Sequence, residues 1–188
     1  MNRSIYFFAF ILIFAAAAFG QARTKTDPIK VGETAPDFTL NDQSGKSIHL
    51  AELKAPTVLV FYRGYWCPFC ARQLADLRSL PKANDKFRMF AISIDPGEKS
   101  IGLAKKIASD GKGEIPFPFL SDPGHKTIDD YGLVDTAYEG QDIYGIPHPT
   151  ILILDKDRKV LWVNISLDYK HRPTAAEVRS QVDELLKK

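Results

Sequence analysis

The fold is decided by residues 57–70, which read TVLVFYRGYWCPFC. The first six of these residues are apolar, β-branched or aromatic, which is typical of a buried strand. Beyond them, apolar residues recur at steps of three or four until Pro81 and predict one face of a helix: Cys70, Leu74, Leu77 and Leu80. Cys67 and Cys70 are the only two cysteines of the chain, and they therefore lie where a strand ends and a helix begins.

The position of the two cysteines predicts a redox-active dithiol. Free N–H groups at a helix N-terminus favour an anion, and the thiolate is the reactive form of cysteine. A structural disulfide is the weaker alternative, because it would close a very small loop and stabilise the fold little. A zinc site needs four ligands, and the four histidines lie in separate segments: His49, His125, His148 and His171. We therefore expect neither a metal nor another cofactor.

The N-terminus predicts export to a periplasm or to the outside. Residues 1–22 carry a positive charge at Arg3, then an almost wholly apolar run, then small residues, which is the layout of a secretory signal peptide. An uncleaved anchor is the alternative, because the run is near the short limit for spanning a bilayer. We expect residues 23–30 to be a linker and residues 31–188 to form one domain.

The charge balance gives no reason to expect a nucleic acid partner. The chain holds 25 Lys and Arg against 23 Asp and Glu, and loss of Arg3 with the signal peptide brings the two nearer to balance. We also expect no membrane contact after cleavage.

The rest of the pattern alternates strands with helices. Strands are expected at 38–40, 47–50, 87–94, 116–120, 151–154 and 160–165, and helices at 101–108, 123–131 and 175–186. This alternation predicts an α/β protein with a mostly parallel sheet covered on both faces, to which the late hairpin adds an antiparallel pair.

In this order the chain resembles the thioredoxin fold: a strand, the segment 66–70, a helix, and Pro149-Thr150 opening a later strand. Within that fold it is similar to the peroxiredoxins of the alkyl hydroperoxide reductase/thiol-specific antioxidant superfamily at residues 31–38, 116–123, 131–133 and 146–155. The resemblance covers nearly all of residues 31–186. It implies a thioredoxin-like α/β fold, with a central mixed β-sheet and helices on both faces.

The peroxide-holding motif of that family is not reproduced. Typical members carry Pro-x-x-x-Thr-x-x-Cys, which places the peroxidatic cysteine at Cys70, the threonine at Cys67 and the proline at Arg63. The arginine that orients the peroxide falls near Pro149, and a common glutamate is replaced by Gln73. The chain therefore resembles the atypical peroxiredoxin-like branch, which keeps a thioredoxin-type pair.

The segment 168–172 also resembles that branch, and its Arg172 is a candidate for orienting the oxidant. A solvated basic loop is the alternative. The resemblance does not assign the roles of the two cysteines. By analogy with thioredoxins, Cys67 would be the exposed nucleophile and Cys70 the resolving cysteine. By analogy with peroxiredoxins, Cys70 would react with the peroxide and Cys67 would resolve. We favour Cys67, because it is nearer the open helix end.

Other residues of the loop have expected roles around the pair. Arg63 and Arg72 would lower a thiol pKa if they turned inward. Pro68 lacks an N–H, which is tolerable in a first helical turn. Trp66 and Phe69 would form an apolar collar against which partners pack.

A second loop, His148-Pro149-Thr150, is expected to face the dithiol. The thioredoxin resemblance implies a cis-proline at Pro149, with backbone groups left free to pair with an incoming chain. His148 would then donate a proton to a leaving thiolate, unless it is an exposed loop histidine.

Three functions follow from these observations. The first is an exported thiol peroxidase that reduces hydroperoxides through a Cys67/Cys70 dithiol–disulfide cycle and is regenerated by a thioredoxin-like electron donor. The second is a thiol–disulfide oxidoreductase whose substrates are protein disulfides. The third is a non-catalytic redox-sensing module.

Overall fold

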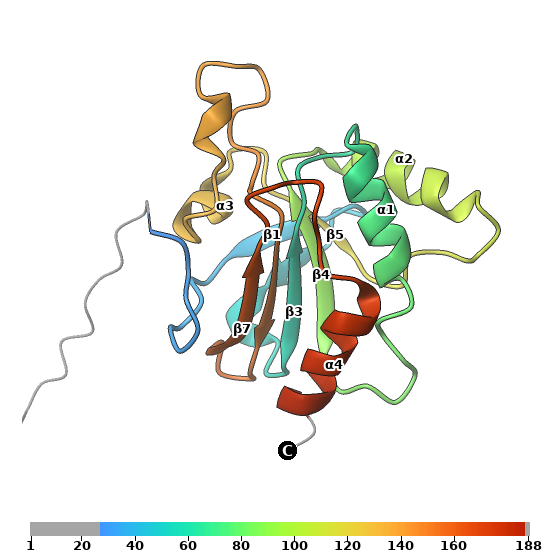
Figure 1. The fold of residues 1–188 in the computed structure, drawn as a ribbon, viewed down its shortest axis with the longest axis vertical. Coiled ribbons are helices and arrows are strands. Elements are labelled where there is room, and N and C mark those ends of the chain that lie inside the picture. The colour runs from blue at the N-terminus through green and yellow to red at the C-terminus, as the bar shows by residue number, and fades with distance from the viewer. Residues whose placement is uncertain (1–26, 187–188) are drawn as a thin grey trace, which may run out of the picture.

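The computed structural model describes residues 27–186 of the 188-residue chain (Figure 1). The predicted signal peptide, residues 1–22, and the first half of the predicted linker lie outside the described residues. None of the helices within residues 27–186 has the length and hydrophobicity of a membrane span.

One seven-stranded sheet forms the centre of the fold, in the order β2-β1-β5-β4-β3-β6-β7. Its strands are β1 (Thr39–Asp42), β2 (Ser47–His49), β3 (Thr57–Phe61), β4 (Arg88–Ser93), β5 (Phe119–Ser121), β6 (Thr150–Leu154) and β7 (Val160–Ile165). Two neighbouring pairs, β3–β4 and β4–β5, are parallel, and the other four are antiparallel. The expected mixed sheet is confirmed, but the expectation that most of it is parallel is wrong, because β6 and β1 both join their neighbours in the reverse direction.

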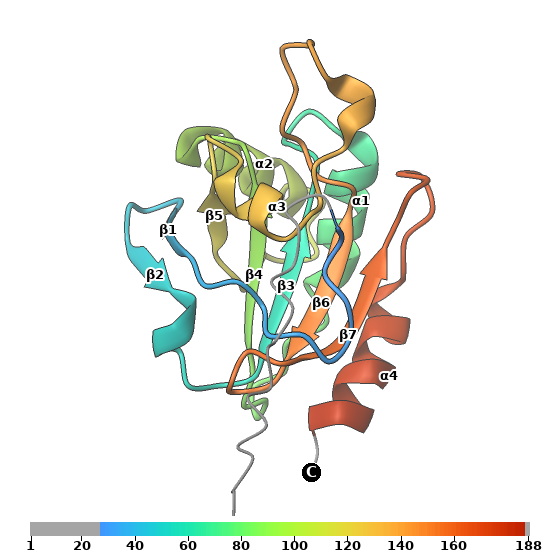
Figure 2. The same cartoon turned by 90° about the vertical axis from the view of Figure 1, so that its left-hand side faces the viewer.

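Helices cover both faces of this sheet (Figures 1 and 2). One face carries α1 (Pro68–Leu77), α2 (Gly97–Ala108) and α4 (Ala175–Leu186), and the other carries α3 (Lys126–Asp130) and the 3₁₀ helix η1 (Leu50–Glu52). Each face therefore has its own apolar core, as expected for a thioredoxin-like fold.

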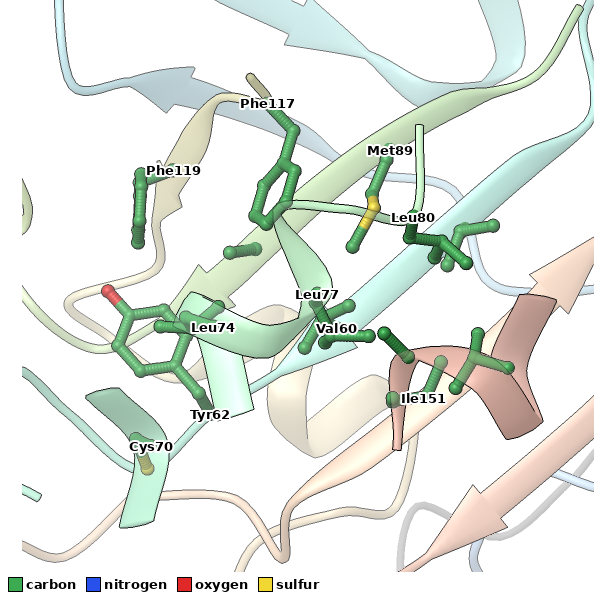
Figure 3. Close-up of a cluster of buried hydrophobic side chains, with 14 of the residues drawn as sticks. Val60, Tyr62, Cys70, Leu74, Leu77, Leu80, Met89, Phe117, Phe119 and Ile151 are labelled. Atoms are coloured by element: carbon green, nitrogen blue, oxygen red, sulfur yellow. The ribbon is translucent and has the colours of Figure 1, made fainter. Parts of the chain in front are cut away.

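Strand β3 contributes to both cores. Val58 and Val60 belong to the core under α1, and Leu59 and Phe61 belong to the core on the opposite face. All five residues of the strand are buried, which explains why it reads as a continuous apolar run. Figure 3 shows the α1 side, where Val60 lies close to Leu77.

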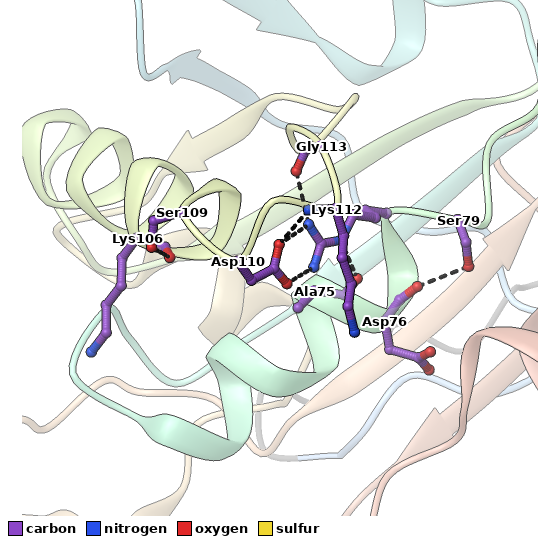
Figure 4. Close-up of polar contacts among 9 residues, drawn as sticks. Ala75, Asp76, Ser79, Lys106, Ser109, Asp110, Lys112 and Gly113 are labelled. Carbon is purple, nitrogen blue, oxygen red and sulfur yellow. Dashed lines mark hydrogen bonds and ion pairs between the residues drawn. The ribbon is translucent and has the colours of Figure 1, made fainter.

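An ion pair ties the end of α1 to the end of α2 (Figure 4). Arg78 Nη1 donates to Asp110 Oδ1 (2.9 Å) and to the carbonyl oxygen of Gly113 (2.8 Å), while its Nε donates to the Ala75 carbonyl (2.7 Å). The guanidinium lowers the pKa of the Asp110 carboxyl to about 2. These contacts hold the C-terminal end of α1 against the turn that follows α2.

The turn after α3 packs against the start of the described chain. Gly132 has a φ of +66°, and a Cβ atom there would lie 2.1 Å from the carbonyl oxygen of Asp27. Beside it, the Ile29 N–H donates to the Tyr131 carbonyl (3.1 Å). Only glycine suits both the backbone conformation and this close approach.

Residues 134–147 form an excursion between α3 and β6, for which the sequence predicted no element. A β-bridge between Val134 and Pro147 closes its base, and it contains the 3₁₀ helix η2 (Thr136–Tyr138). Figures 1 and 2 both place this excursion, the start of α1 and the β7–α4 loop at the same end of the sheet.

Candidate active site

The two cysteines lie at the predicted junction between β3 and α1. Cys67 is the N-cap residue of α1 in an extended conformation (φ −82°, ψ 114°), and Pro68 occupies the first helical turn. Proline fits there because the N–H that it lacks would have no partner within the helix. The positive end of the helix dipole is therefore directed at Cys67.

A buried carboxylate holds the loop that leads to Cys67. The Tyr65 N–H donates to Asp95 Oδ2 (2.7 Å), and Ser93 Oγ donates to the same oxygen (3.0 Å). At Gly64 a Cβ atom would lie 2.7 Å from Trp66 Nε1 and 3.2 Å from Asp95 Oδ1, so the loop leaves little room for a side chain there. Burial raises the pKa of Asp95. Sequence reasoning missed this residue, since its only local signal was a turn after β4.

Both thiols are shielded from solvent, with relative exposures of 2% for Cys67 and 0% for Cys70. The expectation that Cys67 is an exposed thiol is therefore wrong. A helix N-terminus is often open to solvent, but at this one the side chains of Trp66, Tyr138 and Tyr169 gather around Arg63, the second residue after β3. Trp66 was predicted from the sequence to lie beside the thiols, whereas Tyr138 and Tyr169 were not.

The pKa values of the two thiols are shifted in opposite directions. The pKa of Cys67 is lowered, first by a hydrogen bond from the Cys70 thiol and then by the N–H groups of the helix start and by the charge of Arg172. The Cys67 side chain forms no capping hydrogen bond that meets the usual geometric limits. The pKa of Cys70 is raised by its hydrogen bond to Cys67 and by burial. The singly ionised pair therefore has a thiolate at Cys67 and a thiol at Cys70.

Arg172, from the loop between β7 and α4, lies against this pair. Its Nη1 and Nη2 atoms are 3.7 Å and 3.6 Å from Cys70 Sγ, and the Arg63 backbone N–H donates to the same sulfur at 3.4 Å. Arg172 Nη1 also donates to Gln73 Oε1 (2.7 Å), and its Nε donates to the Tyr169 carbonyl (2.9 Å). Within residues 27–186 the guanidinium has only neutral or thiol hydrogen-bond partners, so no carboxylate neutralises its charge.

The Arg63 side chain is also buried, with 4% exposure, and it lies among three aromatic rings. Its guanidinium carbon is 4.2 Å from the ring centre of Tyr169, 5.0 Å from that of Tyr138 and 5.2 Å from that of Trp66. Its Nη2 donates to the Tyr138 hydroxyl (2.6 Å), and its buried Nε has no hydrogen-bond partner. Sequence reasoning missed Tyr138 and Tyr169 as site residues, because only the tertiary structure brings their loops to Arg63.

Two predicted neighbours of the pair lie at its edge. The Phe69 ring meets the Tyr169 ring edge to face, with centroids 5.6 Å apart. Arg72 is exposed and places its guanidinium 5.5 Å over the Phe69 ring, so it does not turn inward toward the thiols.

The predicted cis-proline is not found: no peptide bond is cis within the described residues, so the bond before Pro149 is trans. The backbone on each side of this bond is paired, just before β6 begins at Thr150. The His148 N–H donates to the Leu133 carbonyl (2.7 Å), and the Pro149 carbonyl accepts from the Ser166 N–H (2.8 Å). Thr150 Oγ1 donates to the His148 carbonyl (2.8 Å). The backbone groups expected to be free for an incoming chain are therefore already paired.

His148 is brought to the base of the excursion. Its Nδ1 lies 3.8 Å from Asp135 Oδ2, and no hydrogen bond joins it to either thiol in the described structure. Its role as a proton donor stays a prediction. Within residues 27–186 no group of three or more His, Cys, Asp and Glu side chains is placed to hold a metal ion.

The comparisons with known proteins agree with a thiol-based site. The model of the AhpC/TSA family matches residues 31–163. The thiol-disulfide oxidoreductase ResA of Bacillus thuringiensis subsp. konkukian is 28% identical over 166 residues, which is 88% of this chain and 82% of that protein. The chloroplastic peroxiredoxin Q of Oryza sativa subsp. japonica is 28% identical over 151 residues, 77% of this chain and 63% of that protein.

A solved structure of another protein has the same fold as this chain. The peroxidoxin BcpB from Mycobacterium tuberculosis superposes with a TM-score of 0.65 at 28% identity, over 85% of this chain and 95% of that chain. The family match spans well over half of the sequence and includes both cysteines. The chain therefore belongs to the AhpC/TSA family, and it is an oxidoreductase of the peroxiredoxin-like type with a thioredoxin fold.

Proposed function

We propose that the chain is an exported thiol peroxidase that reduces hydroperoxides through a Cys67/Cys70 dithiol–disulfide cycle. The observation that carries the proposal is the position of Arg172. Its guanidinium nitrogens lie 3.6–3.7 Å from Cys70 Sγ, and both cysteines of the pair are buried. A closed pair suits a small oxidant better than the disulfide of another protein. Arg172 supplies a cation beside the thiols, although the arginine of typical family members is missing near Pro149.

The first step uses the lowered pKa of Cys67. The Cys67 thiolate attacks one peroxide oxygen, a sulfur–oxygen bond forms, and the O–O bond breaks. The sulfur is oxidised to a sulfenic acid, and the leaving oxygen is reduced and takes up a proton to give water or an alcohol. The positive charge of Arg172 favours both the thiolate and the charge that builds on the leaving oxygen.

The second step uses Cys70. Its thiol loses a proton, and Arg172 and the Arg63 N–H stabilise the resulting thiolate at the contacts given above. This thiolate attacks the Cys67 sulfur, the sulfur–oxygen bond breaks, water leaves, and a disulfide forms. An external dithiol, which we propose to be a thioredoxin-like protein, returns the pair to its reduced state by thiol–disulfide exchange. This step requires the site to open after oxidation, because the reduced pair is closed to another protein.

A second candidate function is thiol–disulfide exchange with protein disulfides. It is favoured by the C-x-x-C pair at the helix N-terminus and by the similarity to ResA, a thiol-disulfide oxidoreductase. The two functions are separated by measuring turnover of hydrogen peroxide and of insulin disulfides side by side, with dithiothreitol as the reductant. We expect peroxide turnover that is lost in Cys67→Ser, with insulin reduction no faster than dithiothreitol alone. Fast insulin reduction without peroxide turnover would refute the peroxidase.

Export and domain limits belong to the same proposal. The apolar run within residues 1–22 supports a cleaved signal peptide, followed by a linker at 23–30 and the redox domain at 31–188. Mass determination of the protein recovered from outside the cytoplasm tests this. A mature chain that begins near residue 21 or 23 is expected, and an intact N-terminus would contradict cleavage.

A further inference from the structure

We infer that Tyr138 limits access to the dithiol by size, so that the enzyme takes small hydroperoxides and excludes bulky ones. This inference rests on the proposed peroxidase and names its substrate class: hydrogen peroxide and hydroperoxides with short alkyl groups. It concerns the excursion 134–147, which no part of the redox chemistry requires.

The excursion is built to hold Tyr138 in one place. Its base is closed by the bridge from Val134 to Pro147 and by an Asp135 N–H that donates to the Ile146 carbonyl (2.9 Å). Asp135 also caps η2, because its Oδ1 accepts from the Ala137 N–H (3.2 Å). The segment that carries Tyr138 is therefore held by the body of the fold at its base and by its own cap.

Tyr138 is the last residue of η2 and contacts the side chain of Arg63. Its hydroxyl accepts from Arg63 Nη2 at 2.6 Å, and the guanidinium carbon lies 5.0 Å from its ring centre. Arg63 is the residue whose own N–H contacts Cys70 Sγ. The excursion is thus fastened directly to the residue that leads out of β3 into the dithiol loop.

The same guanidinium gathers rings from two other segments, Trp66 from the dithiol loop and Tyr169 from the β7–α4 loop. Within the described residues it has no carboxylate partner, so these rings and the Tyr138 hydroxyl hold it in place. Three segments distant in the sequence therefore meet around the Arg63 side chain. Both thiols are buried although they stand at a helix N-terminus, which fits an entrance that this cluster closes.

The test compares small and bulky reagents on the same thiols. In Tyr138→Ala we expect the rate of labelling by a fluorescein maleimide, relative to that by iodoacetamide, to rise about tenfold, because a charged hydrogen bond and a cation–π contact are lost together. Tyr138→Phe keeps the ring and loses only the hydrogen bond, so its rise should be smaller. The matched control is Tyr144→Ala, which removes another tyrosine of the excursion whose ring lies against His125.

A second readout uses oxidants. The rate ratio of cumene hydroperoxide to hydrogen peroxide should rise in Tyr138→Ala and stay at the wild-type value in Tyr144→Ala. Unchanged ratios in both Tyr138 variants, or an equal rise in Tyr144→Ala, would overturn the inference. If Tyr138→Ala fails to fold by circular dichroism, the Tyr138→Phe ratios decide.

The two readouts separate this inference from the proposed function. Maleimide labelling needs reactive thiols and no peroxide chemistry. A wild-type protein that does not reduce peroxide, but whose labelling ratio rises in Tyr138→Ala, would refute the peroxidase and keep the size limit. A wild-type protein that reduces both hydroperoxides equally well, with labelling ratios independent of Tyr138, would keep the peroxidase and refute the size limit.

Discussion

Replacing Arg172 with glutamine removes the cation that contacts the dithiol and leaves a side chain that still forms hydrogen bonds. The guanidinium nitrogens lie 3.6–3.7 Å from Cys70 Sγ. The charge of the reduced pair resides on Cys67, one hydrogen bond farther away, so the relevant separation is roughly 7 Å and the attraction is about 2 kcal/mol at an effective dielectric constant of about 20. Arg172 is half-buried, and solvent screening reduces this to about 1 kcal/mol.

This energy corresponds to a rise of somewhat under one unit in the pKa of Cys67. The assay is the rate of alkylation by iodoacetamide as a function of pH, because only the thiolate reacts. In the variant the curve should move to higher pH, so that alkylation below the pKa slows by about fivefold while the plateau at high pH is unchanged.

The matched control is Arg72→Gln, because Arg72 is an exposed arginine near the pair whose guanidinium lies over Phe69. It should move the curve by much less, since an exposed charge is screened by solvent. Equal shifts in the two variants, or no shift in Arg172→Gln, would refute the placement of Arg172 as the cation of the site.

Three further substitutions test the contact of Gln73 with Arg172, the packing at Gly132 and the burial of Asp95. Gln73→Leu removes the oxygen that accepts a hydrogen bond from Arg172 Nη1. The pH dependence of alkylation by iodoacetamide should then show a rise in the pKa of Cys67 that is smaller than the rise in Arg172→Gln. A larger rise would mean that Gln73 acts on the thiols by another route. Gly132→Ala should lower the free energy of unfolding in urea by roughly 3 kcal/mol, because a Cβ at φ +66° would meet the Asp27 carbonyl at 2.1 Å; full stability would contradict this packing. Burial raises the pKa of Asp95 in the folded state, so the free energy of unfolding of the wild type should fall as the pH rises from about 4 through that raised pKa. Asp95→Asn should lack this fall. If urea unfolding gives parallel curves of stability against pH for the two proteins, this prediction is contradicted.

Local patterns in the sequence predicted most of the elements. The span of β7 was predicted as it is found, at Val160–Ile165, and β3 and α1 lie on either side of the cysteine loop as expected. Each of these elements has a local signal in the sequence: an apolar run for β3 and β7, and apolar residues at steps of three or four for α1. The direction of each strand has no such local mark, which is why the expected proportion of parallel pairs was wrong.

The site was only partly predictable, for a related reason. The thiols and Arg172 were identified from a motif and from a resemblance, and the structure brings them together. Asp95, Tyr138 and Tyr169 act through contacts between segments that are distant in the sequence, and no period or spacing marks such contacts. The isomer of the bond before Pro149 likewise depends on tertiary context: the bond is trans, and the backbone groups on its two sides are hydrogen-bonded to Leu133 and Ser166, which are distant in the sequence.

Peroxidase activity at Cys67 can be measured by stopped-flow oxidation of the reduced protein with hydrogen peroxide, followed through Trp66 fluorescence. We predict a second-order phase orders of magnitude faster than the reaction of a free thiol, which is lost in Cys67→Ser and kept in Cys70→Ser. In Cys70→Ser the reaction should stop at a sulfenic acid on Cys67 that dimedone traps. A wild-type rate no better than that of a free thiol would contradict the peroxidase, and a fast phase kept in Cys67→Ser would show that Cys70 is the nucleophile.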